Sequence, residues 1–93
     1  MFAIGDKMWP GVSKLVEEIG ELGQVLGKLM GSRGKLEHWS GDLWGMLHDE
    51  IGDMLGAVKF VMERCTLDVK RIHERAEAKY NLFQEWHKKD PES

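Results

Sequence analysis

The chain has 93 residues, a length at which one domain can only just bury a hydrophobic core of its own. Apolar residues make up 42% and charged residues 31%, which excludes a disordered chain and a membrane-spanning one. The net charge of -3 comes without a dense run of Lys or Arg, so duplex nucleic acid is excluded as a partner. We therefore expect a single soluble domain over residues 1–93 that assembles with further copies of itself.

The only cysteine is Cys65, so the chain forms no internal disulfide. The N-terminus lacks the charged segment and long apolar stretch of a secretory signal. Both features predict a protein of the reducing cytoplasm.

Apolar residues recur every three or four positions in the first third of the chain, which predicts an amphipathic helix over about residues 13–30. Two glycines and two cations interrupt this pattern at 31–35, and the polar sequence that follows predicts a loop up to about Gly41. No segment alternates apolar and polar residues with a period of two, so we expect no sheet.

Helical spacing resumes over about residues 43–64, and Ser40 or Asp42 is placed to cap the start of this second helix. A third helix is predicted over about residues 67–88, with Thr66 as its N-cap. The fold class is therefore all-α. We expect a three-helix protomer whose first two helices form a four-helix bundle with those of a second copy, in a homodimer or a homotetramer.

The first two helices contain several glycines, each of which costs about 1 kcal/mol relative to alanine. Spacings of three and four place them along one side of a helix, where a backbone can approach closely. We expect the two helices to pack tightly at these positions, which are Gly20, Gly23, Gly27, Gly52 and Gly56.

Acidic residues form two pairs at the same spacing. Glu18 and Glu21 share one face of the first helix, and Glu50 and Asp53 share one face of the second. An antiparallel hairpin would bring the pairs together, and a divalent cation is the natural counter-charge. Carboxylates without thiolate or imidazole favour Mg²⁺, or Mn²⁺, and the Glu-x-x-His of di-iron bundles is absent. The alternative is two solvated acidic faces balanced by lysines.

Glu17-Glu18-x-x-Glu21 on one helix, followed by Glu50-x-x-Asp53 on the next, resembles the signature of the MazG-like nucleotide pyrophosphohydrolases. The resemblance implies an enzyme that hydrolyses a (d)NTP to the (d)NMP and pyrophosphate. It also implies that the metal ligands are Glu18, Glu21, Glu50 and Asp53. Glu17 would be a further catalytic carboxylate, which helps to hold a second metal or orients water.

Substrate binding would need cations for the phosphates and an aromatic surface for the base. Arg75 and Lys79 lie one turn apart on the third helix, where the family often has basic residues; the alternative is an exposed surface. Trp9 and Trp39 are the first candidates for stacking on a base, ahead of Trp44. A tryptophan in a small helical protein can equally be a core or interface residue.

A non-catalytic helical interaction module is the competing hypothesis. A stripe of Met46, Met54 and Met62 would then bind a partner helix, while the acidic residues keep the chain soluble. The two hypotheses differ at Glu50, because Glu50→Gln should abolish metal binding and activity in the enzyme but leave partner affinity intact in the module.

Overall fold

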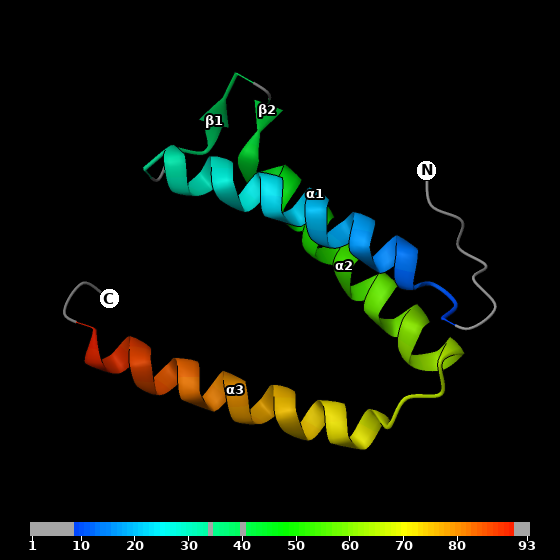
Figure 1. Cartoon of the computed structure of the whole chain (residues 1–93). Helices are drawn as coiled ribbons and strands as arrows, with labels where there is room; N and C mark the ends of the chain where they lie inside the picture. Colours follow the sequence, from blue (N-terminus) through cyan, green and yellow to red (C-terminus); the bar gives the residue numbers. More distant parts are fainter. Residues whose placement is uncertain (1–8, 34, 40, 91–93) are drawn as a thin grey trace.

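A computed structural model of the chain describes residues 9–33, 35–39 and 41–90 (Figure 1). Its helices are α1 (Val12–Gly31), α2 (Leu43–Arg64) and α3 (Val69–Lys89). The all-α prediction is confirmed, and each helix end lies within two residues of its predicted position. Within the described residues, none of the helices is both long enough and apolar enough to cross a bilayer.

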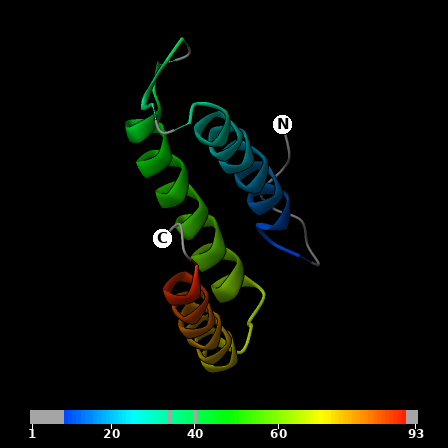
Figure 2. The ribbon, with the colours of Figure 1, turned by 90° about the vertical axis from the view of Figure 1, so that its left-hand side faces the viewer.

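Helices α1 and α2 run antiparallel and lie side by side (Figures 1 and 2). The small core lies between them and consists of Val25 from α1 and of Leu43 and Val61 from α2. Leu43 is fully buried at the start of α2, and Val61 is buried near its end. Apolar packing therefore holds the α1–α2 hairpin together at both ends.

The α1–α2 connection contains a minimal antiparallel ladder, in which β1 (Glu37–His38) pairs with β2 (Gly41–Asp42). The Leu43 amide continues it by donating to the Leu36 carbonyl at 2.8 Å. The expectation of no sheet is wrong here, because strands of two residues are too short to show a period of two.

Asp42 caps α2 as predicted, since its side chain accepts a hydrogen bond from the Trp44 amide at 3.0 Å. Ser40, the other candidate, lies outside the described residues. The predicted cap of α3 is wrong, because Asp68 rather than Thr66 accepts from the Arg71 amide at 3.0 Å.

Thr66 instead belongs to the end of α2. Its φ of 53° is left-handed, and the following Leu67 amide donates to the Met62 carbonyl at 3.1 Å. This is the pattern of a Schellman motif, usually built on glycine. It reverses the chain and sends α3 back at an angle to the α1–α2 hairpin (Figure 1).

Helix α3 contains no buried residue. It meets α2 near its own start, where Val69 and His73 line an apolar groove with α2 residues such as Val58 and Met62. The whole chain measures 44 × 35 × 15 Å, so in its thinnest direction it is little more than one helix thick.

The prediction that the helix glycines allow close packing is wrong. A Cβ added at Gly20, Gly23, Gly27, Gly52 or Gly56 would meet nothing within 4 Å. The glycine with the closest neighbours is Gly11, just before α1. Its φ is 84°, and an added Cβ would overlap the Phe60 ring. Gly11 therefore fixes the start of α1 against α2.

We predict that Gly11→Ala lowers the free energy of unfolding by about 1–3 kcal/mol, because it adds left-handed strain and a clash with Phe60. The same change at Gly20 should raise it by up to about 1 kcal/mol, because that Cβ enters open space within a helix. Urea denaturation measures both. Equal effects at the two positions would contradict the close contact at Gly11.

Candidate metal centre

The structure brings the two acidic pairs together. Glu18 and Glu21 from α1 and Glu50 and Asp53 from α2 each offer one carboxylate oxygen, and these four oxygens all lie within 4.8 Å of one another. We call these four residues the acidic quartet. The convergence follows from the i,i+3 spacing within each helix and from the antiparallel pairing of the helices.

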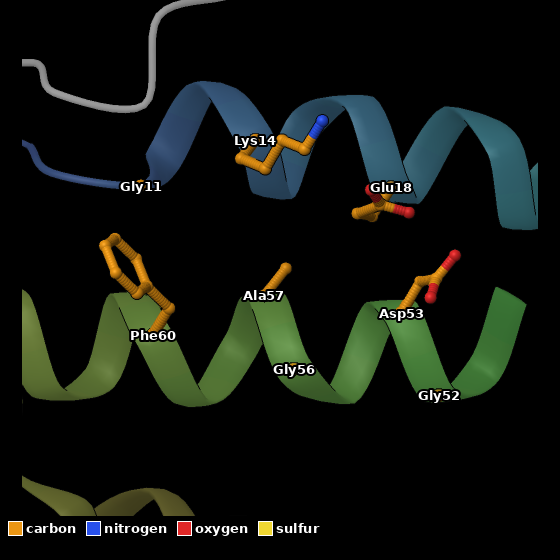
Figure 3. Close-up of a pocket in the computed structure, with 8 residues that line it drawn as sticks. All are labelled: Gly11, Lys14, Glu18, Gly52, Asp53, Gly56, Ala57 and Phe60. Carbon is orange, nitrogen blue, oxygen red and sulfur yellow. The ribbon is translucent and has the colours of Figure 1, made fainter.

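Two quartet members occupy positions at which the core is otherwise apolar. Glu18 lies seven residues before the buried Val25, and Glu50 lies seven residues after the buried Leu43. Residues seven apart share one face of a helix, so both carboxylates point into the α1–α2 seam. Figure 3 shows Glu18 reaching toward Asp53 across this seam.

The quartet contains two buried oxygen atoms without a hydrogen-bond partner. Glu18 is 8% exposed and its Oε2 is unpaired, and Oε2 of the half-buried Glu50 is also unpaired. A buried carboxylate oxygen without a donor is destabilising, and such atoms are rare in native proteins. A proton or a cation at the quartet would remove this penalty.

Burial and neighbouring negative charges raise the pKa of both Glu18 and Glu50. Burial raises the pKa of Glu18 above 4.5, and the charges of Glu21 and Asp53 raise it further, while the charge of Lys14 partly opposes the rise. Burial likewise raises the pKa of Glu50, with further contributions from the charges of Glu21 and Asp53 and from a hydrogen bond with Glu21.

The spacing of the quartet suits a hard divalent cation. Opposite ligands of Mg²⁺ lie about 4.2 Å apart, and those of Ca²⁺ about 4.6–5.2 Å. Adjacent ligands of octahedral Mg²⁺ lie about 2.9 Å apart, and the quartet oxygens lie within 4.8 Å of one another, so any two of them need to approach by at most about 1.9 Å to bind one ion. The quartet can therefore hold a metal ion.

Glu17 lies outside the quartet. Its Oε2 accepts a hydrogen bond from the Lys14 Nζ at 3.2 Å, and this interaction raises the pKa of Lys14, which therefore stays protonated at neutral pH. The sequence predicted lysines only as balancing charges, yet the Lys14 charge is the influence that opposes the rise in the Glu18 pKa.

A groove of about 430 Å³ runs along the α1–α2 seam from the quartet (Figure 3). Glu18 and Asp53 line one end, and the Phe60 ring lies at the other end, toward the start of α1. Sequence reasoning overlooked Phe60, although its position seven residues after Asp53 was a usable signal. The remaining lining residues are Gly11, Lys14, Gly52, Gly56 and Ala57.

The predicted substrate-binding residues do not meet the quartet within one chain. Arg75 and Lys79 are exposed on α3 and do not line the groove. Trp9 and Trp39 are 56% and 90% exposed and also lie outside the groove lining.

The three methionines of the alternative hypothesis do not form a stripe. Met46, Met54 and Met62 are spaced by eight residues, so each is turned by about 80° from the one before. Met46 approaches Gly41, whereas Met62 lines the groove between α2 and α3.

Comparisons with protein-family models, with curated proteins and with solved structures found no match to this chain.

We predict that Mg²⁺ or Mn²⁺ stabilises the protein. A cation that binds only the folded chain adds about 2.7 kcal/mol at a concentration of 100 times its Kd, which corresponds to a rise in Tm of roughly 10–20 °C. Thermal melts with metal and with EDTA measure the effect. Glu50→Gln should abolish most of the gain, and a full gain in this variant would exclude the quartet as the binding site.

The pH dependence of the metal-free protein should have a definite sign. A carboxyl group whose pKa is raised on folding binds more protons in the folded state, so stability falls as pH rises from about 4.5 through the raised value. Melts in EDTA between pH 4.5 and 8 should show this decline, and it should be shallower in Glu50→Gln. Identical slopes would contradict the raised pKa of Glu50.

Proposed function

We propose that this protein is a Mg²⁺-dependent nucleoside triphosphate pyrophosphohydrolase that acts as a homodimer. The observation that carries the proposal is the acidic quartet with its unpaired, buried Glu18 oxygen. Four oxygen ligands favour Mg²⁺ or Mn²⁺ over softer metals. The order of the acids along the chain, which resembles the MazG-like signature, supplies the reaction.

In this reaction, water adds across the anhydride between the α and β phosphates, and the nucleoside monophosphate, pyrophosphate and one proton leave. Mg²⁺ would neutralise the negative charge that the triphosphate brings to the site. Glu18, Glu21, Glu50 and Asp53 would hold the metal, and their mutual repulsion is what makes the quartet a strong ligand set.

The proposal gives Lys14 and Glu17 a joint role. The Lys14 ammonium lies on the groove wall beside the quartet, where it can pair with a phosphate oxygen. Its hydrogen bond to Glu17 holds it there, so Glu17 is a positioning residue in this scheme rather than a metal ligand.

The homodimer is supported by the surface that a single chain leaves exposed. A compact protein of 10.7 kDa exposes about 5,500 Å², whereas this chain exposes 7698 Å². The excess of about 2,200 Å² per chain, or about 4,400 Å² for two chains, is of the size that obligate dimers bury in total. The radius of gyration of 16.1 Å also exceeds the roughly 12 Å of a compact domain of this length. A second layer of helices from another copy would make up the difference.

Both helices of the hairpin carry a second apolar seam that does not face the other helix. In each seam the residues are spaced by four, three, four, three and four, which is the heptad pattern of helix bundles. Most of these side chains are exposed; Met30 is 80% and Leu55 is 64% exposed. The seam of α1 comprises Val12, Val16, Ile19, Gly23, Leu26 and Met30, and that of α2 comprises Trp44, His48, Ile51, Leu55, Val58 and Met62.

The two seams lie on the same side of the hairpin. In each helix the seam is rotated by about 120° from the face that meets the other helix, in the direction of increasing residue number. Because the helices are antiparallel, this rotation turns both seams the same way. In the second half of the α2 seam, Leu55, Val58 and Met62 also line the groove shared with the start of α3. The α1 seam and the first half of the α2 seam thus offer one apolar face, and two such faces would form a four-helix bundle.

The dimer also gives α3 a role. The apolar stripe of α3 includes Tyr80 and Phe83, which are 62% and 54% exposed. This stripe is therefore also exposed in a single chain. We propose that α3 packs across the second copy and that Arg75 and Lys79 reach the triphosphate of the partner's quartet. Trp9 and Trp39 remain candidates for stacking on the base in that assembly.

A helical interaction module remains the second candidate, because the exposed apolar face would also suit a foreign helix. A homodimer is favoured over a foreign partner because the apolar seams of α1 and α2 match, with the same spacing and the same length. The module accounts for neither the quartet nor its unpaired oxygens.

We predict release of pyrophosphate from one or more canonical NTPs or dNTPs with Mg²⁺ or Mn²⁺, and none with EDTA. Glu50→Gln should lower kcat/KM by at least about 100-fold, because it removes a metal ligand. Lys59→Gln, outside the quartet and its groove, is the control and should retain full activity. A folded protein that releases no pyrophosphate from any nucleotide in the panel would refute the proposal.

We predict a dimer of about twice 10.7 kDa in sedimentation equilibrium. Leu26→Glu places a charge in the α1 seam and should weaken the dimer more than about a hundredfold, since each copy loses a buried leucine. Gln24→Glu, two residues away and off the seam, should leave the mass unchanged. A monomeric wild type, or equal behaviour of the two variants, would contradict the proposed face.

A further inference from the structure

The groove beside the quartet is larger than a metal ion needs. It encloses about 430 Å³ and extends from Asp53 to Phe60, a distance of about 10 Å along α2. The buried Glu18 side chain, with its unpaired Oε2, lines the end near Asp53. The groove is therefore continuous with the metal centre, and it extends well past the position of a bound cation.

The α2 wall of the groove is open because its residues are small. A Cβ at Gly52 or Gly56 would meet nothing within 4 Å, and Ala57 presents a single methyl group. Helix-interior glycines cost stability, and here they pack against nothing in the chain. Their effect is to leave space beside the quartet that any larger side chain would occupy.

The far end of the groove offers an aromatic surface that is held in place. The Phe60 ring lies against Gly11, whose left-handed backbone leaves no room for a side chain, and the Arg64 guanidinium lies 5.4 Å from the ring centroid. Among the described residues that line the groove, Lys14 supplies the one cation. The order along the groove is therefore the quartet with Gly52 beside it, then Lys14 opposite Gly56 and Ala57, and then the aromatic ring (Figure 3).

We propose that this groove binds the nucleoside part of the substrate, with the sugar over Gly56 and Ala57 and the base against Phe60. The inference rests on the proposed function, because the quartet fixes the phosphates at one end. Stacking on a ring tolerates every base, since each has a π face. The groove thus favours a nucleoside triphosphate over inorganic polyphosphate and selects weakly among bases.

Gly56→Leu tests the inference, because its Cβ meets nothing within 4 Å and Gly56 lines the groove that the added side chain would fill. Gly20→Leu is the matched control, since its Cβ also meets nothing within 4 Å and it does not line the groove. Calorimetry with Mg²⁺ compares two probes, an α,β-imido nucleoside triphosphate and inorganic triphosphate, on the dimeric wild type and on each variant. Circular dichroism confirms that each variant is folded.

Gly56→Leu should weaken the nucleotide analogue about 5- to 150-fold, the range expected for the loss of one stacked base. Its affinities for inorganic triphosphate and for Mg²⁺ should stay within about twofold of wild type. Phe60→Leu, which keeps an apolar side chain against Gly11, should weaken the nucleotide in the same selective way. Gly20→Leu should change neither probe.

Unchanged nucleotide affinity in Gly56→Leu would overturn the inference and leave the proposed function standing. An equal loss for both probes would also overturn it, because the change would then act through the metal centre. If the wild type binds Mg²⁺ but neither probe, the proposed function itself fails, and the nucleoside groove fails with it.

Discussion

The repulsion among four carboxylates at the interface between α1 and α2 is the constraint on which the rest of this structure depends. Glu18 and Glu50 occupy heptad positions that hold Val25 and Leu43 one repeat away, so the chain gives up apolar packing at the middle of the core that its described residues form. The apolar contacts at the two ends of the hairpin must hold the helices together against that repulsion. A bound cation would turn the destabilising centre into a stabilising one.

The helices and the quartet were predictable from the sequence because both depend on short-range periodicity. Three- and four-residue spacing determines each helix, and Glu-x-x-Glu and Glu-x-x-Asp determine which acids share a face. The ladder at Glu37–His38 and the cap at Asp68 were missed, because a strand of two residues has no period and several polar residues competed as caps. Thr66 was misassigned because a β-branched residue in a left-handed helix end is uncommon.

The groove could not be predicted, because it depends on how far each helix is rotated about its axis. The glycines were expected between the helices, yet Gly52 and Gly56 open the groove and Gly23 lies in the exposed α1 seam. A helix that is apolar around more than half of its circumference has more than one face that can meet a neighbour. Only the α1–α2 packing shows which of those faces meets the other helix and which is left exposed.

The groove and the apolar face lie on opposite sides of the hairpin, and this arrangement links the proposed assembly to the proposed activity. The α2 seam is rotated about 120° from the α1-facing side in one direction, and the groove residues Asp53, Gly56 and Phe60 are rotated from it in the other. A second copy packed on the exposed apolar face would therefore stabilise the α1–α2 hairpin without filling the groove. In the proposed assembly the dimer would make the quartet more rigid, and the same dimer would leave the mouth of the groove open to the proposed substrate.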